Sequence, residues 1–280
     1  MMGRYIKYEI KGSYKFILGV LALVLILITG IFAYSINVDE GSVLGGMFVG
    51  LSTLVIFGTL LTTFLYIVGS FRKELYEDRG YLTFTLPLTG NKILGAKLIV
   101  AIIWFILLGI VIAGYNILMV MIFTPIKLNI SEFFSMIRGM NIPYREIIAF
   151  AIAVIISGVS TLILIYFSMA LGRVTLRNKK IGGFWFVIFL VLSGLISYVQ
   201  IKIIQLLPYY IDLNTFKIIS YDMFNKGFAS FSVIQFNDAA LLTSNGDTTI
   251  LNIGGFLYNI LIVVITFLGT GHLIENKIDL

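Results

Sequence analysis

Two long stretches without a charged residue flank a short charged segment, and this pattern constrains the fold more than any other feature. Residues 43–71 and 98–125 contain no Asp, Glu, Lys, Arg or His. Each stretch exceeds the roughly 20 residues that an α-helix needs to cross the hydrocarbon core of a membrane. Residues 72–97, which we call the charged island, hold five Lys or Arg against three Asp or Glu. The island therefore joins two predicted spanning helices at a membrane surface, and its basic excess predicts the cytoplasmic side.

The composition agrees with a chain that crosses a membrane several times. Of the 280 residues, 59% are hydrophobic and only 12% are charged, whereas about a quarter of the residues in soluble domains are charged. Cysteine is absent, which excludes disulfides and thiolate metal sites. The formal net charge of +6 would suit nucleic-acid binding, but basic residues of membrane proteins concentrate in cytoplasmic loops, and we favour that interpretation.

Uncharged runs predict spanning helices at residues 16–38, 43–71, 98–123, 147–171, 181–200 and 250–270. Before the first run, residues 1–15 place Ile6 and Ile10 on one helical face and Arg4, Lys7 and Lys11 toward water. This pattern predicts an interfacial helix that leads into the membrane. A cleaved signal peptide is the competing interpretation, but its apolar region would be about 7–15 residues long, and further spans follow here.

Charge counts orient the predicted spans. With both ends of the chain in the cytoplasm, the inside segments hold fourteen Lys or Arg and the outside segments hold six, which satisfies the positive-inside rule. Residues 201–249 mix apolar pieces with turn signals and are too broken for an ordinary span, so we predict an extracytoplasmic cap of short or re-entrant helices. The sequence thus predicts an all-α membrane protein with six transmembrane helices, forming one transmembrane domain over residues 1–280.

The charged island divides into a short helix and a hinge. Residues 72–80 can form about two helical turns, in which Lys73 and Glu77 make an i,i+4 pair. Pro87 restricts the residue before it, and residues 89–91 supply the turn and capping chemistry that starts the next helix. A short helix fixed at both ends to spanning helices can serve as a lever for a partner protein. The alternative is a solvated loop whose charges only set the topology.

Here the sequence resembles a known family. The segment ELYEDRGYLTFTLPLTGNKILGAKL is similar to the cytoplasmic loop of ABC-2 type transporter permeases, in which a gate-and-coupling helix precedes a Gly-Tyr-Leu-x-x-x-Leu-Pro segment. The resemblance covers the island in detail and the rest of the chain in architecture, with the coupling helix between spans 2 and 3. In that family the loop touches the ATP-binding subunit. The resemblance implies a multi-pass permease of a bacterial plasma membrane.

The resemblance also implies roles for individual residues. The coupling helix and its exit, which would dock on the ATP-binding subunit, correspond to Arg72, Lys73, Glu74, Leu75, Tyr76, Glu77, Asp78, Arg79, Gly80 and Tyr81. Leu86 and Pro87 would form the hinge into the third span. A secondary cytoplasmic contact would involve Arg173, Arg177, Lys179 and Lys180. The implied partners are two ATP-binding subunits, which hold ATP and Mg, and a second permease chain in a homodimer or heterodimer. Substrate-contacting residues do not transfer, because the family carries diverse substrates.

The chain offers no residues for a catalytic site of its own. The phosphate-binding pattern G-x-x-x-x-G-K-[ST] is missing, so ATP hydrolysis is expected in a separate subunit. His272 is the single histidine and cannot build an H-E-x-x-H metal site, and no G-x-S-x-G elbow supports an intramembrane hydrolase. The predicted spans contain no Asp, Glu, Lys or Arg, which disfavours an ion-coupled transporter that powers itself.

Two functions of different classes follow from these observations. The first is a permease subunit that exports an amphipathic substrate, such as an antimicrobial peptide, toxin or drug, with energy supplied by its partner. The second is a membrane sensor or immunity protein that binds a peptide without transporting it. A neighbouring gene for a Walker-type ATPase would favour the first.

Overall fold

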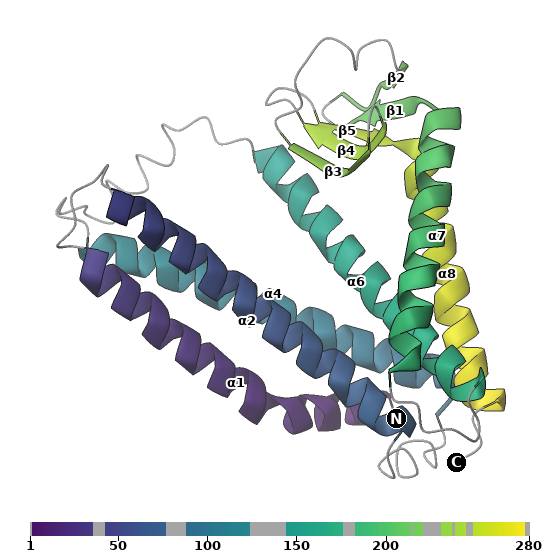
Figure 1. Ribbon diagram of the computed structural model, residues 1–280, viewed down its shortest axis with the longest axis horizontal. Coiled ribbons are helices and arrows are strands. Elements are labelled where there is room, and N and C mark those ends of the chain that lie inside the picture. The colour runs from purple at the N-terminus through teal and green to yellow at the C-terminus, as the bar shows by residue number, and fades with distance from the viewer. Residues whose placement is uncertain are drawn as a thin grey trace. The chain divides into compact units, whose positions relative to one another are not determined.

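The computed structural model describes residues 2–35, 43–76, 88–123, 144–175, 183–213, 215–220, 231–236, 239–244 and 249–277. Long helices dominate this part of the chain (Figure 1). They are α1 (Met2–Ser35), α2 (Val43–Tyr76), α4 (Gly90–Phe123), α6 (Tyr144–Thr175), α7 (Phe184–Leu206) and α8 (Ile253–Asn276).

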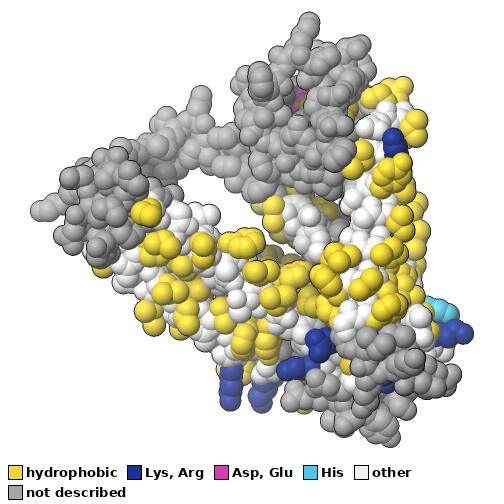
Figure 2. Space-filling view, in the orientation of Figure 1, with side chains coloured by type: hydrophobic (Ala, Val, Ile, Leu, Met, Phe, Trp, Pro, Cys, Tyr) yellow, Lys and Arg dark blue, Asp and Glu magenta, His cyan; other side chains and the backbone are white. Residues whose placement is uncertain are grey.

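Within the described residues, six helices are long and apolar enough to cross a membrane. Their outward faces carry large hydrophobic side chains; Ile26 and Ile110, for example, are 71% and 68% exposed. In the space-filling view, hydrophobic side chains cover much of the visible surface of these helices (Figure 2). Soluble monomers rarely expose contiguous apolar patches larger than a few hundred Å². The prediction of a multi-span membrane protein is confirmed at this level.

The helices extend past the uncharged runs that predict them. α1 includes the segment predicted as a separate interfacial helix, so that segment and the first span form one continuous helix. α2 continues beyond Phe71 to Tyr76 and takes in the first five residues of the charged island. Lys, Arg, Glu and Leu are good helix formers, so charge alone does not end a helix. The described part of the predicted coupling helix is therefore the end of α2, not a separate element.

The chain divides into two compact units. The first comprises Met1–Lys73 and Gly95–Asn141, and the second comprises Glu74–Leu94 and Ile142–Leu280. The chain passes between the units within α2 and within α4. The described residues of the island on either side of residues 77–87, which are residues 74–76 and 88–94, consequently belong to the second unit.

In the first unit, α1, α2 and α4 lie side by side (Figure 1). Ile17 and Ile28 of α1 pack with Trp104 and Leu108 of α4 in a cluster of buried side chains. Partly buried residues of α2 border this cluster. Toward the far end of the bundle, the hydroxyls of Thr29 and Tyr115 form a hydrogen bond of 2.5 Å, which gives the Tyr115 hydroxyl a polar partner between the helices.

In the second unit, α6 packs against α7 and α8, and α7 packs against α8. Between α6 and α8, the Ser160 hydroxyl donates to Asn259 Oδ1 at 3.2 Å. Between α7 and α8, the buried Gln200 donates from Nε2 to the Gly255 carbonyl at 3.2 Å. A Cβ at Gly255 would lie 2.7 Å from Ile204 Cγ1, so glycine permits this close approach. Small residues and polar side chains are the usual means of joining helices in a membrane.

Five short strands lie between α7 and α8. They are β1 (Tyr209–Asp212), β2 (Ile218–Ser220), β3 (Phe231–Phe236), β4 (Ala239–Ser244) and β5 (Thr249–Asn252). They form one antiparallel sheet in the order β2-β1-β5-β4-β3. Asn252 links the sheet to both helices: its Oδ1 accepts from Gly255 N at 2.7 Å and caps α8, while its Nδ2 donates to the Leu207 carbonyl at 3.0 Å.

The sheet corrects two predictions. The described residues between α7 and α8 are strands, so the expectation of short or re-entrant helices there is wrong, and the fold class is not purely all-α. The physical signal lies in the sequence. Strands β3 and β4 are six-residue runs separated only by Asn237 and Asp238, which are turn-forming residue types. Two short runs separated by two such residues are typical of a β-hairpin.

Candidate coupling site at the charged island

The structure places part of the predicted coupling residues. At the end of α2, Arg72 and Lys73 are exposed, Leu75 is buried, and Glu74 and Tyr76 are partly buried. Arg173 lies near the end of α6. The remaining predicted site residues lie outside the described residues; these are Glu77, Asp78, Arg79, Gly80, Tyr81, Leu86, Pro87, Arg177, Lys179 and Lys180. The site is therefore built from the two segments that border residues 77–87.

The first border of the island is attached to α6. The Tyr76 hydroxyl donates a hydrogen bond of 3.0 Å to the backbone carbonyl of Met169. The guanidinium carbon of Arg173 lies 5.9 Å from the centroid of the Tyr76 ring, within the range of a cation–π interaction. Tyr76 and Arg173, predicted separately as parts of a main and a secondary cytoplasmic contact, thus lie together.

Gly172 makes this attachment close. A Cβ at this position would lie 3.1 Å from the Tyr76 hydroxyl oxygen and 3.3 Å from the Cβ of Trp185 at the start of α7. The end of α2, the end of α6 and the start of α7 therefore meet around one glycine. Trp185 is part of this junction, although it lies outside the residues predicted for either cytoplasmic contact.

The second border of the island is attached to α8. The Thr89 carbonyl accepts hydrogen bonds from Lys92 N at 2.9 Å and Ile93 N at 3.2 Å, so α4 begins where residues 89–91 predicted a helix start. The backbone N–H of Gly90 donates to Glu275 Oε2 of α8 at 3.4 Å. A carboxylate is favourable at this end of α4, where the first backbone N–H groups lack helical partners.

Two glycines bring α4 and α8 into backbone contact. A Cβ on Gly90 would overlap the backbone carbonyl oxygen of Gly271, and a Cβ on Gly271 would overlap Asn91 Oδ1. Next to this contact, Ile93 and Leu94 of α4 and Thr270 of α8 are buried. The two borders of the island are thus fixed to α6 and α8 of the same unit. Among the described residues this arrangement offers no catalytic chemistry; it offers a mechanical connection.

Removing the Tyr76 hydroxyl tests the first attachment. We expect Tyr76→Phe to lower the free energy of unfolding by about 1 kcal/mol, because the phenol gives up one hydrogen bond to a backbone carbonyl. The measurement is thermal or denaturant unfolding of the full chain in detergent. Tyr8→Phe is the matched control, because Tyr8 is 71% exposed. Equal stabilities of the two variants would contradict the attachment.

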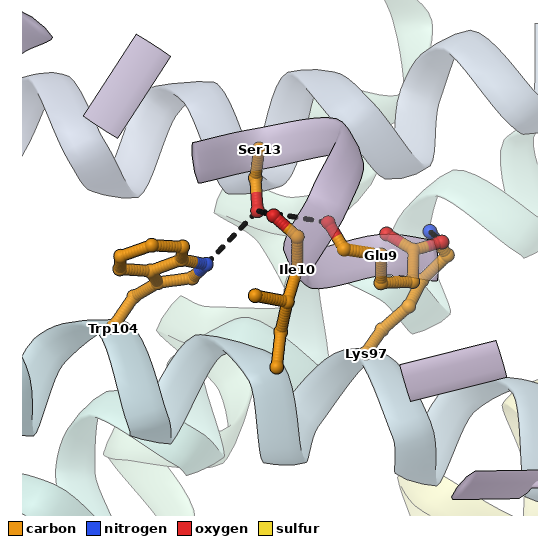
Figure 3. Close-up of polar contacts among 5 residues, drawn as sticks. All are labelled: Glu9, Ile10, Ser13, Lys97 and Trp104. Carbon is orange, nitrogen blue, oxygen red and sulfur yellow. Dashed lines mark hydrogen bonds and ion pairs between the residues drawn. The ribbon is translucent and has the colours of Figure 1, made fainter. Parts of the chain in front are cut away.

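Sequence reasoning missed a second polar site, at the last residue of the island. Lys97 is not in a solvated loop: it is 5% exposed, and its Nζ lies 2.8 Å from Glu9 Oε1 of α1 (Figure 3). One turn further along α1, the Ser13 hydroxyl donates to the Glu9 carbonyl at 2.8 Å and accepts from Trp104 Nε1 at 2.9 Å. These contacts join α1 to α4 within the first unit.

A signal for this pair exists in the sequence. Lys97 lies three residues after Leu94, four after Ile93 and seven before Trp104, which places it on the buried stripe of α4. A lysine within an apolar helical stripe needs a buried partner. Glu9 is the only acid between residues 2 and 35, so it was the available partner on α1.

Comparisons with known proteins add no identification: no family model, curated protein sequence or solved structure matches this chain.

Proposed function

We propose that this chain is the membrane subunit of an ATP-driven exporter of the ABC-2 type. It pairs with a second permease chain and with two ATP-binding subunits, which hold ATP and Mg and hydrolyse the nucleotide. The chain lies in a bacterial plasma membrane with the charged island and both termini on the cytoplasmic side. Its cargo is an amphipathic molecule such as an antimicrobial peptide, toxin or drug.

The attachment of both borders of the island to one unit is the observation that supports this function best. Tyr76 bonds to Met169 of α6, and Gly90 contacts Gly271 and Glu275 of α8. A partner that binds residues between these borders and moves them therefore pulls on α6 and α8 together. A solvated loop that only sets topology has no need for close backbone contact at its root.

The residues for docking are charged and accessible where the structure describes them. Arg72 and Lys73 are exposed on the last turns of α2, beside the attached Tyr76. Charge complementarity between such residues and a protein partner mainly sets partner choice and association rate. The resemblance of the island to the coupling loop of ABC-2 permeases supplies the identity of the partner.

A co-purification experiment tests this function. The chain is co-expressed with a tagged ATP-binding protein encoded beside its gene. We expect Arg72→Glu together with Lys73→Glu to reduce the recovered complex about tenfold, because charge reversal at the docking surface replaces attraction by repulsion. The matched control is Lys202→Glu together with Lys217→Glu, two exposed lysines outside the island. This control should leave the complex intact.

The outcomes separate the two function classes. Recovery of the native complex, with loss only in the island variant, supports a coupled permease. Unchanged recovery and unchanged ATPase stimulation in the island variant would argue against coupling through the island. If the native chain recruits no ATP-binding protein and no such gene lies beside its own, the membrane sensor is the better interpretation.

A further inference from the structure

The N-terminal part of α1 carries four exposed basic side chains on one face. Arg4, Lys7, Lys11 and Lys15 are all exposed. With about 100° of rotation per residue, these four positions fall within a sector of about 80° around the helix axis. We call this surface the basic stripe. In Figure 2, several Lys and Arg side chains project from the lower edge of the visible surface.

No acid balances the stripe on its own helix. Glu9 is the only acid of α1, and helical geometry places it about 140° around the axis from Arg4. Its carboxylate points toward α4 and pairs with the buried Lys97 at 2.8 Å (Figure 3). The ion pair therefore turns the one negative side chain of α1 inward and leaves the outer face of this segment purely cationic.

The stripe adjoins a spanning segment without a break in the helix. α1 continues from Lys15 into an uncharged apolar run, and both parts belong to the first candidate span, Met2–Ala33. Tyr8 and Tyr14 are exposed among the cations, and aromatic side chains of this kind concentrate at membrane interfaces. In a membrane, a row of cations directly beside a spanning segment would lie at the depth of the lipid headgroups.

From this placement we propose that the basic stripe binds anionic phospholipid headgroups. Clusters of four or more Lys or Arg next to a transmembrane helix attract anionic lipids through their phosphate charge. The buried Glu9–Lys97 pair contributes by fixing the rotation of this segment, so that the four cations face the lipid together. An acidic protein surface is the competing occupant of the stripe, and the experiment separates the two.

The absence of cysteine allows a direct test in the full chain. A Tyr8→Cys variant carries a single bimane fluorophore within the stripe, in nanodiscs of four parts phosphatidylcholine to one part phosphatidylglycerol. Two preparations are compared, one with brominated phosphatidylcholine and one with brominated phosphatidylglycerol. The brominated lipid quenches a fluorophore that lies near it. We expect the share of quenching caused by phosphatidylglycerol to be about threefold its one-fifth share of the bilayer at low salt, and to fall as salt is raised.

Two variants and a second label position complete the test. Changing all four stripe residues to Gln should return the quenching to the bulk share. Changing the exposed Lys92, Lys202, Lys217 and Lys277 to Gln, which removes the same charge, should leave the enrichment intact. The second label position is Ile26→Cys, which is 71% exposed and lies within the span. Quenching of bimane there should match the bulk share of phosphatidylglycerol in the native chain and in both Gln variants. If the quenching at Tyr8→Cys with the native stripe matched the bulk share of phosphatidylglycerol, the proposal would be overturned in favour of an acidic protein partner. If both Gln variants lost the enrichment equally, the enrichment would depend on the net charge of the protein and not on the stripe.

Discussion

Replacing Lys97 by Met should lower the free energy of unfolding by about 3 kcal/mol, because it removes the ammonium group that pairs with the partly buried Glu9 carboxylate. Removal of one member of a buried ion pair typically costs about 3–5 kcal/mol. The lower end applies here because Glu9 keeps 17% of its side-chain exposure, whereas Lys97 keeps only 4%. Unfolding of the full chain in detergent, followed by the fluorescence of Trp104 and Trp185, measures the loss.

The double variant decides whether the loss comes from the uncompensated charge. Lys97→Met combined with Glu9→Gln removes both charges, and the combination should recover most of the stability, since replacement of a whole buried pair is often close to neutral. Lys92→Met is the control for the substitution itself, because Lys92 lies on the same helix and is exposed. A double variant as unstable as the single one would show that packing of the lysine stem, and not charge, carries the effect.

The spanning helices could be predicted because hydrocarbon imposes a minimum length on an uncharged run. The true ends of the helices could not be predicted in this way, because the length of an uncharged run shows only where charged residues begin in the sequence. Thus residues 2–15 join the first span in α1, and α2 continues through Arg72 and Lys73 to Tyr76. The start of α4 was predictable from residues 89–91, because capping and turn chemistry are local properties of the backbone.

The sheet and the ion pair were missed for different physical reasons. The strands between Tyr209 and Asn252 are short, and their pairing order depends on contacts between segments that are distant in sequence. Lys97 was assigned to the charged island because the prediction counted charges along the chain. It did not consider which face of a helix each charge occupies. The spacing of Lys97 from Ile93 and Trp104 places all three on one helical face, and this predicts that Lys97 is buried.

The attachment of the island to α6 was beyond sequence reasoning. Tyr76 and Met169 are 93 residues apart, and the hydroxyl of Tyr76 donates to the backbone carbonyl of Met169. Every residue has a backbone carbonyl, so the residue type at position 169 does not indicate this contact. Glycine was the only residue type here that suggested a close approach between helices. A Cβ built on most of the described glycines in the spanning helices would meet no neighbouring atom. Gly50, for example, has no neighbouring atom within 4 Å of a Cβ built on it.

Gly90→Ala should be the most damaging single-methyl change in the island. Its added Cβ would overlap the backbone carbonyl oxygen of Gly271, and neither backbone can rotate away as a side chain would. Forcing such an overlap in a packed interface typically costs about 1–3 kcal/mol, and we expect about 2 kcal/mol here. Gly109→Ala and Gly114→Ala are matched controls on α4, because a Cβ at either position meets nothing within 4 Å. Both controls should hold or slightly raise stability, since Ala favours a helix interior over Gly.

Gly271→Ala distinguishes backbone contact from side-chain contact at the same junction. Its Cβ would overlap chiefly the Asn91 side-chain amide, which is exposed and can be removed by substitution. Adding Asn91→Ala should therefore restore most of the stability lost in Gly271→Ala, but none of that lost in Gly90→Ala. Unfolding midpoints of the three single variants and two doubles, measured in one detergent, test this pattern. Equal rescue of both glycine variants by Asn91→Ala would contradict a backbone contact between α4 and α8, and with it the rigid attachment through which the island would move α8.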